Sequence, residues 1–244
     1  MEPTSPLVPD QPSRERARAA VHAVLSGPGL AGELDAVRLA AVVLQALIPP
    51  GEKSVTLRSQ SLGEWVGVSL SHVASLVTPG LRRAAWHTAP DGDPGLVFTS
   101  PTAAAPDGAL RPVVSALFAP GTGLMGTRTG RGAATDRLAF LLLVLDTSAT
   151  GEVRLIDGPV DSQRGRISAT IAALLGCGLP GASKIADRLE AMNLVERWRE
   201  ENCVWPVSGR PPVHPRSPPV GAAAKPGRPE HLPPGRALFV QCGV

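Results

Sequence analysis

A short polar run in the first half of the chain carries side chains that could hydrogen-bond to a nucleic acid. They are spaced along one face of an expected helix, at Ser69, Ser71, His72 and Ser75. Serine hydroxyls and a histidine ring can donate hydrogen bonds to phosphate oxygens or to the edges of bases. Arg82 and Arg83 follow near the end of the same helix, where guanidinium groups suit phosphate contacts. The run therefore predicts a surface for binding DNA.

Apolar residues around this run predict two helices joined by a tight turn. Helical spacing in residues 59–77 sets two buried faces, the first of Leu62, Trp65 and Val66 and the second of Val73, Leu76 and Val77. Gly67 falls between them, where a residue without Cβ accepts a positive φ, and Val68 plugs the turn. Ser69 is a good N-cap for the second helix. This is the pattern of a helix-turn-helix, whose second helix enters the DNA major groove.

The same pattern occurs again 109 positions later, in residues 168–186. Without a gap, Gly67 falls on Gly176 and Val68 falls on Cys177. A repeated apolar spacing with the turn glycine in register is stronger than one copy, because single short motifs match by chance. The alternative is a pair of ordinary helical hairpins in an all-helical protein.

The second copy carries different side chains at its outward positions. By position they are Gly178, Pro180, Gly181 and Lys184, with Ser183 and Arg188 beside them. Only Lys184 and Arg188 offer obvious phosphate-binding chemistry. We therefore expect the first copy to read bases and the second to hold the DNA backbone. The alternative is that one copy, the second rather than the first, is a surface for a dimer or another partner.

The segments that flank the first copy predict a helix, a strand and a hairpin. Asp35 caps a helix that ends before Pro49, and residues 54–57 read as a strand. Residues 85–88 and 96–99 read as two further strands around a turn rich in proline and glycine. The order of elements is therefore helix, strand, helix, turn, helix and hairpin.

The flanks of the second copy repeat this order. Residues 137–146 match residues 38–47, and residues 151–156 match the first predicted strand. Residues 195–199 and 237–240 would form the hairpin, joined by a very long wing tip. The alternative is that residues 203–244 are a disordered tail.

In this order the two copies resemble the winged helix-turn-helix superfamily, in tandem, over roughly two thirds of the chain. The resemblance implies a mainly α fold with small β-hairpins (α+β), in two winged-helix domains. It also implies a sequence-specific double-stranded DNA-binding protein, foremost a bacterial transcriptional regulator. Tandem winged helices also look like plasmid or mobile-element replication initiators. A protein-interaction scaffold whose winged helices do not bind DNA is the hypothesis from another class.

Five segments are expected along the chain. A disordered N-terminus covers residues 1–13, the first winged-helix domain residues 14–100, and a linker residues 101–134. The second winged-helix domain covers residues 135–244 and includes a basic, proline-rich wing or tail at residues 203–236.

The positive charge of the chain is concentrated near its C-terminus. The net charge of +3 is low for a nucleic-acid binder. Residues 203–244 hold five basic residues, Arg210 among them, against one acidic residue, and the rest of the chain holds 19 basic and 20 acidic residues. Arg210 therefore joins the candidate DNA contacts, and any DNA affinity of the body must come from local patches.

Several other classes of protein find no support in the sequence. No apolar run reaches the roughly 18 residues of a membrane span, and the first residues lack the pattern of a signal peptide. The three cysteines have no zinc-binding spacing, and Cys177 is expected to be a small buried apolar residue. No catalytic motif stands in its proper context. We therefore expect no enzyme activity, cofactor or metal, a cytoplasmic, nucleoid-associated location, and DNA as the partner of a monomer or homodimer.

Overall fold

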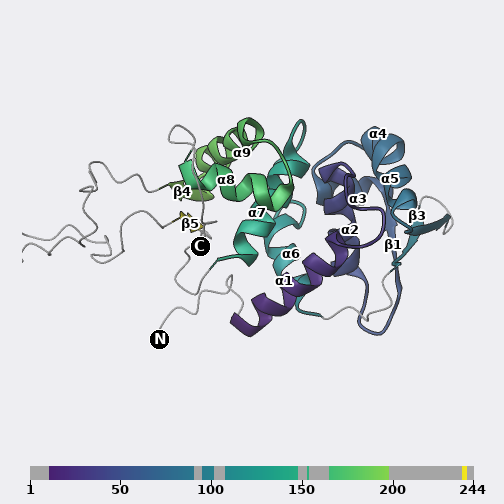
Figure 1. Ribbon diagram of the computed structural model, residues 1–244. Coiled ribbons are helices and arrows are strands. Elements are labelled where there is room, and N and C mark those ends of the chain that lie inside the picture. The colour runs from purple at the N-terminus through teal and green to yellow at the C-terminus, as the bar shows by residue number, and fades with distance from the viewer. Residues whose placement is uncertain are drawn as a thin grey trace, which may run out of the picture.

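The computed structural model describes residues 11–90, 95–101, 108–147, 153, 165–197 and 238–240. Its helices pack together, with a small three-stranded sheet at one end and a two-stranded pair at the other (Figure 1). Both sheets are antiparallel. The fold class is therefore mixed α and β, mainly helical with small antiparallel sheets, as the sequence predicts.

Residues 35–99 contain the predicted series of elements. They are α2 (Asp35–Leu47), β1 (Ser54–Arg58), α3 (Ser59–Val66), α4 (Leu70–His72), η1 (Val73–Val77), α5 (Thr78–Arg83), β2 (His87–Pro90) and β3 (Gly95–Thr99). The strand β3 lies between β1 and β2 and is antiparallel to both. The hairpin begins two residues later than predicted, because Ala85 takes a left-handed φ of 61° directly after α5.

The turn between the two motif helices has the predicted chemistry in both copies. Gly67 and Gly176 have φ values of 81° and 71°, which a residue without Cβ adopts at little cost. The Ser69 hydroxyl accepts a hydrogen bond from the backbone N–H of His72 at 3.3 Å, as an N-cap does. Val68 and Cys177 are half-buried against the core, so both contribute to the apolar side of their turns.

The prediction that Leu76 is buried is wrong. The Leu76 side chain is 40% exposed, whereas Val73, Val77 and Leu81 are fully buried. Residues Val73–Val77 form a short π-helix, in which each turn holds more residues than an α-helical turn. The wider turn shifts the buried face away from Leu76, and the 3/4 spacing of the sequence does not reveal it.

The second half of the chain contains three helices and a pair of strands among the described residues. They are α7 (Ala133–Leu145), α8 (Gly165–Leu175), α9 (Leu179–Ala191), β4 (Val195–Arg197) and β5 (Leu238–Val240). The strands β4 and β5 pair antiparallel, with Val195 opposite Val240, as predicted for a hairpin. Residues 198–237 lie outside the described residues. Of the strand predicted at residues 151–156, only Val153 is described, and it bridges to Thr147.

Two helices extend into segments that the sequence assigned to the disordered N-terminus and to the linker. The first helix, α1 (Gln11–Leu25), begins three residues before the predicted start of the first domain. The helix α6 (Leu110–Phe118) lies inside the predicted linker and buries Val114 and Phe118 completely. Met125, also in that linker, is 1% exposed. The segment from Leu110 to α7 is therefore part of the packed body rather than a tether.

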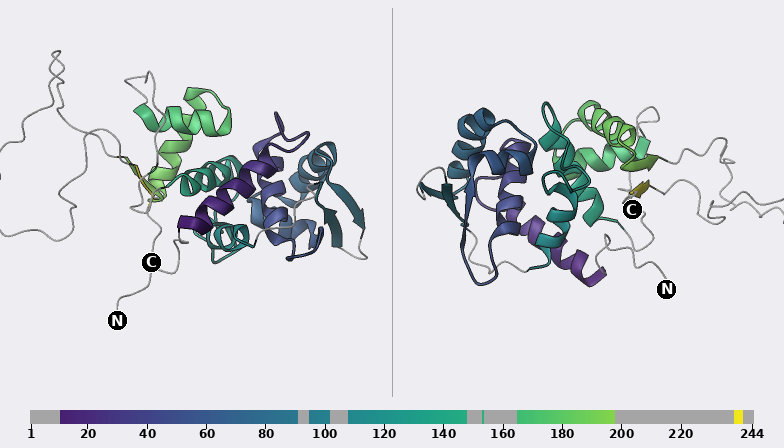
Figure 2. Two further views of the ribbon diagram at one scale, coloured as in Figure 1. Left: turned by 60° about the horizontal axis from the view of Figure 1, so that its bottom comes forward. Right: turned by 180° about the vertical axis from the view of Figure 1, so that it is seen from behind.

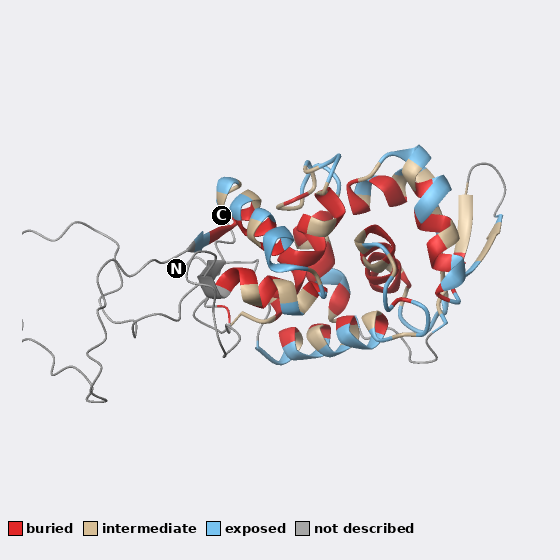
Figure 3. Ribbon diagram, turned by 45° about the horizontal axis from the view of Figure 1, so that its top comes forward, coloured by how far each residue is buried: buried red, intermediate tan, exposed pale blue. Residues whose placement is uncertain are grey.

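A single hydrophobic core joins the two halves of the chain. The helices α2 and α7 pack against each other at its centre, and α1 and α6 contact both of them (Figure 2). Buried residues lie on the sides of the helices that meet, and exposed residues lie on the outer sides (Figure 3). The two copies of the motif are thus carried on one packed centre.

No single helix among the described residues is long and apolar enough to cross a membrane. The consecutive segments Ile167–Leu175 and Leu179–Ala191 pass such a test only together, by length and composition, with a bend of 112° between them.

Replacing Gly67 with alanine is expected to destabilise the protein more than the same change at Gly51. Both glycines have a positive φ, 81° and 85°, which costs other residues about 1–2 kcal/mol. A Cβ at Gly67 would lie 2.8 Å from the carbonyl oxygen of Arg128, whereas Gly51 faces open space. This overpacking adds about 1–3 kcal/mol. Denaturant unfolding measures both losses, and equal losses would contradict the close approach of Arg128.

Candidate nucleic-acid interface

The first candidate surface is the outer face of the helix formed by residues 70–83. Ser69, Ser71 and Ser75 are exposed, and His72 is half-buried. The hydroxyl oxygens of Ser69 and Ser71 lie 3.0 Å apart and form a hydrogen bond. The structure therefore places the four predicted base-reading side chains at the N-cap and along the first turns of one helix, three of them open to solvent.

Arg82 and Arg83 lie on the same helix and are exposed, but each already has a partner. The Arg82 guanidinium donates to the hydroxyl of Thr88 at 2.6 Å. Arg83 forms two hydrogen bonds with the Glu33 carboxylate, at 2.7 and 2.9 Å. The hydrogen bond and charge of Arg83 hold the pKa of Glu33 below its usual value. The positive charge of Arg83 is thereby balanced within the protein.

The second candidate surface, on α9, is nearly devoid of base-reading side chains. Gly178, Pro180, Gly181 and Lys184 are exposed, and Ser183 is half-buried. The Lys184 side chain is thus available for a phosphate contact. Arg210, the remaining predicted contact, lies outside the described residues.

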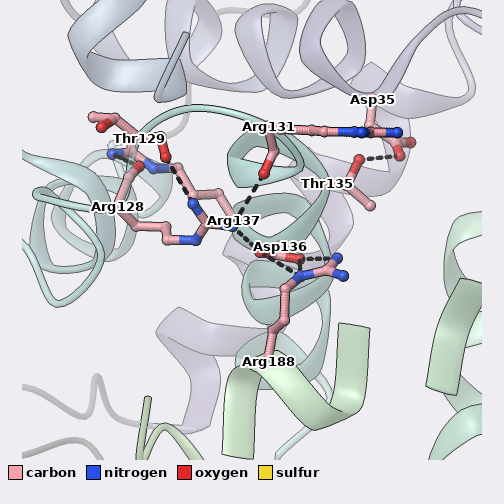
Figure 4. Close-up of polar contacts among 8 residues, drawn as sticks. All are labelled: Asp35, Arg128, Thr129, Arg131, Thr135, Asp136, Arg137 and Arg188. Atoms are coloured by element: carbon pink, nitrogen blue, oxygen red, sulfur yellow. Dashed lines mark hydrogen bonds and ion pairs between the residues drawn. The ribbon is translucent and has the colours of Figure 1, made fainter. Parts of the chain in front are cut away.

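Arg188 of α9 points into the protein rather than toward a ligand. Its guanidinium grips both oxygens of the Asp136 carboxylate, with Nη2 2.6 Å from Oδ1 and Nε 3.0 Å from each oxygen (Figure 4). Asp136 is fully buried at the start of α7 and also accepts from Arg128 Nη2 at 3.0 Å. The hydrogen bond that Arg188 donates to the Asp136 carboxylate raises the pKa of Arg188. Arg188 therefore anchors α9 to α7, a role that the sequence did not indicate.

Arg137, the neighbour of Asp136, is the largest fully buried side chain among the described residues. Its guanidinium donates to the carbonyls of Glu64 (2.8 Å) and Trp65 in the last turn of α3. It also donates to the carbonyls of Gly126 (3.3 Å) and Arg128 (2.8 Å) in the loop before α7. Arg137 therefore ties the first helix-turn-helix to the second half of the chain.

Burial is the main influence on the titration of Arg137. Removal from water, with a smaller contribution from the charge of Arg128, lowers the pKa of Arg137 to about 10. The group is still cationic at neutral pH. Its charge is balanced by four carbonyl dipoles and by the ring of Phe118, whose centre lies 5.9 Å from the guanidinium carbon.

A smaller polar contact joins α2 and α7 near the start of both helices. Asp35 was predicted as the N-cap of α2, but it is the first helical residue and caps nothing with its side chain. Its carboxylate instead accepts from Arg38 at 3.1 Å and from the hydroxyl of Thr135 at 2.8 Å. Arg38 also donates to the carbonyl of Leu175 at 2.9 Å, in the last turn of α8. The Asp35 side chain thus bonds to Arg38 and to α7 instead of capping α2.

Reasoning from sequence missed the buried groups Asp136 and Arg137. The available signal was an adjacent acid and base at the start of the apolar run of α7, on the side that must enter the core. No cluster of possible metal ligands occurs in the described part of the chain. Burial raises the pKa of the half-buried Cys177 thiol, which suits the apolar role predicted for it.

No protein-family model matches this chain, and neither curated proteins nor solved structures gave a match.

Replacing Asp136 with asparagine is expected to cost about 2–3 kcal/mol of unfolding free energy. Removing one partner from a buried ion pair costs about 3–5 kcal/mol, and partial exposure of Arg128 and Arg188 reduces that figure here. Glu33→Gln is the matched control, because it breaks an arginine–carboxylate pair whose arginine is exposed, and such pairs contribute little to stability. Denaturant titration compares them, and equal costs would show that burial of Asp136 adds nothing.

Proposed function

We propose that this protein binds double-stranded DNA in a sequence-specific manner through two winged helices in tandem. The observation that carries the proposal is the order of elements in residues 35–99. A helix, a strand, a helix–turn–helix and a hairpin follow one another, and β3 lies between β1 and β2. A winged helix has this order, and its second motif helix is the one that enters the major groove.

The second half of the chain supports the same interpretation. The helices α7, α8 and α9 are followed by the antiparallel strands β4 and β5. The bend of 112° between α8 and α9 lies in the range of about 90–120° that helix-turn-helix motifs adopt, whereas a helical hairpin would run antiparallel. The residues 35–99 and 133–240 would then be the two winged helices.

The two surfaces would contribute differently to binding. On the first, the exposed hydroxyls of Ser69, Ser71 and Ser75, with His72, would contact base edges or phosphates. On the second, Lys184 would contact a phosphate. Arg188 would act indirectly, because its bond to Asp136 fixes the position of α9.

A transcriptional regulator is the role that we favour for such a protein. A replication initiator of a plasmid or mobile element would use the same surfaces. The position of the recognised sequence separates the two roles, since a regulator binds near the start of a gene and an initiator binds an array within an origin.

A protein-interaction scaffold is a second candidate, favoured by one specific observation. Leu70 and Leu76 on the first outer face are 54% and 40% exposed, and Leu179 at the start of α9 is 36% exposed. Exposed apolar side chains of this size suit a protein partner as well as the methyl groups of thymine. The salt dependence of binding distinguishes the two functions, because only phosphate contacts weaken steeply as salt rises.

The experiment that tests the proposal is selection of bound duplexes from a random DNA pool at near-physiological salt. A recovered motif, bound with an affinity that falls steeply with salt, would support DNA reading. Failure to enrich any sequence, with only weak binding to all duplexes, would contradict the proposal and favour the scaffold.

Substitution of the first surface should change preference, whereas substitution of the second should change affinity for all duplexes. The double change Ser71→Ala and His72→Ala is expected to lose about 1–3 kcal/mol of discrimination at the contacted base pairs. Lys184→Ala is expected to weaken binding to every duplex and to lower the salt slope by about one. Quantitative binding to the selected motif and to mismatched duplexes measures both effects.

Lys53→Ala is the control for the loss of one positive charge. Lys53 is an exposed lysine in the segment between α2 and β1, outside both motifs in the sequence. The Lys53→Ala variant should have nearly the same affinity and the same salt slope as the unmodified chain. Unaltered preference in the Ser71 and His72 variant would show that the helix of residues 70–83 does not read bases.

A further inference from the structure

The first helices of the two repeats carry an equivalent arginine. Aligning residues 137–146 with residues 38–47 places Arg137 on Arg38. Both lie near the start of their helices, α7 and α2, and both donate to backbone carbonyls rather than to solvent. The equivalence of the two arginines comes from the sequence alone, so it is independent of the contacts that they make in the structure.

Each arginine reaches across to the turn of the other repeat. Arg38, in the first repeat, donates to the carbonyl of Leu175 in the last turn of α8. Arg137, in the second repeat, donates to the carbonyls of Glu64 and Trp65 in the last turn of α3. The helices α3 and α8 are the equivalent first helices of the two motifs. The contact is therefore reciprocal.

Reciprocal contact is the signature of two-fold symmetry. When element A of one unit contacts element B of the other, and the reverse contact also exists, a rotation of half a turn relates the two units. Units that follow one another by translation would make one of these contacts but not the other. The packing of α2 against α7, each the first helix of its repeat, agrees with the rotation.

Two further contacts hold this arrangement in place. Thr135 of α7 donates to Asp35 of α2 at 2.8 Å, which joins the starts of the two central helices. Arg188 of α9 is held by the buried Asp136 of α7. Figures 1 and 2 show α9 and the helix of residues 70–83 along the same side of the molecule, opposite α1. One elongated ligand lying along this side could therefore contact both helices.

We propose that a single chain binds one bipartite DNA site whose two half-sites are inverted relative to each other, at a fixed spacing. The inference rests on the proposed function and specifies the form of its ligand. DNA symmetry mirrors protein symmetry when two recognition helices are related by a two-fold axis. The buried contacts of Arg137 and Asp136 keep the two motifs from turning to fit a direct repeat.

The two outer faces carry different side chains and would select different half-site sequences. The relative orientation of the half-sites therefore cannot be read directly from the selected motif. A variant that copies the first face onto the second removes this difference. Its substitutions are Gly178→Ser, Pro180→Ser, Gly181→His and Lys184→Ser. A Cβ at Gly181 would meet nothing within 4 Å, and one at Gly178 would approach only the Pro180 ring, at 3.8 Å. The fold has room for these changes.

Selection from the same random duplex pool then reports the orientation. The grafted chain is expected to enrich two copies of one half-site in inverted orientation, whereas the unmodified chain enriches two unlike halves. Changing the spacer by about five base pairs, half a turn of the duplex, should weaken binding roughly tenfold or more, because one half-site turns to the far face. The single change Lys184→Ser is the matched control and should not produce a symmetric motif.

Other results would overturn the inference. Two copies in the same orientation, or a single half-site, would exclude the inverted arrangement while leaving DNA binding intact. Recovery of no motif by the unmodified chain would overturn the proposed function together with the inference.

A second measurement on the unmodified chain covers a failure of the graft to fold. Hydroxyl-radical footprinting on its selected duplex is expected to show protections on the two strands that mirror each other about one centre. A pattern repeated by translation along the same strand would overturn the inference.

Discussion

The capture of the Arg137 guanidinium by backbone carbonyls is the interaction on which the rest of the structure depends. A fully buried cation without partners would cost several kcal/mol, so its surroundings must supply hydrogen bonds. The carbonyls of Glu64 and Trp65 do so at the C-terminal end of α3, where the helix dipole favours a positive charge. Burial of Arg137 therefore fixes the end of α3 against α7 and requires the loop at Gly126 and Arg128 to close over it.

In each motif, the end of the first helix is held in the core, whereas the start of the second helix lies at the surface. The last turn of α3 is held inside by Arg137, and the last turn of α8 is held by Arg38. The helices that follow begin on the outer side, where Leu70 and Leu179 are both exposed. The bonds of Arg137 and Arg38 to these turns use backbone carbonyls, so they place no demand on the side chains of Ser71, Ser75 and Lys184.

The sequence was sufficient to predict features whose causes are local. The burial of Leu62 and Val66 and the positive φ at Gly67 and Gly176 depend on a few neighbouring residues and are as predicted. Trp65, predicted on the same buried face, is half-buried. The exposure of Leu76 was not predictable by spacing, because a π-helical turn is set by packing. The partner of Arg188 lies 52 positions away, so no local pattern distinguishes an arginine that binds phosphate from one that anchors a helix. The outward position was thus predicted correctly for Ser71 and Ser75 but not for the charged Arg188.

The two halves of the molecule carry different side chains on their outer surfaces but make similar hydrogen bonds to each other. Arg38 and Arg137 each donate to a carbonyl in the last turn of the first motif helix of the other repeat, whereas Ser71 of the first motif corresponds to Pro180 of the second. This division has a physical origin. A cross-repeat hydrogen bond to a backbone carbonyl needs only the arginine and the path of the turn, which the glycine with positive φ preserves. The outer side chains can therefore diverge without disturbing the centre, and a core held by reciprocal contacts can present two unlike outer surfaces.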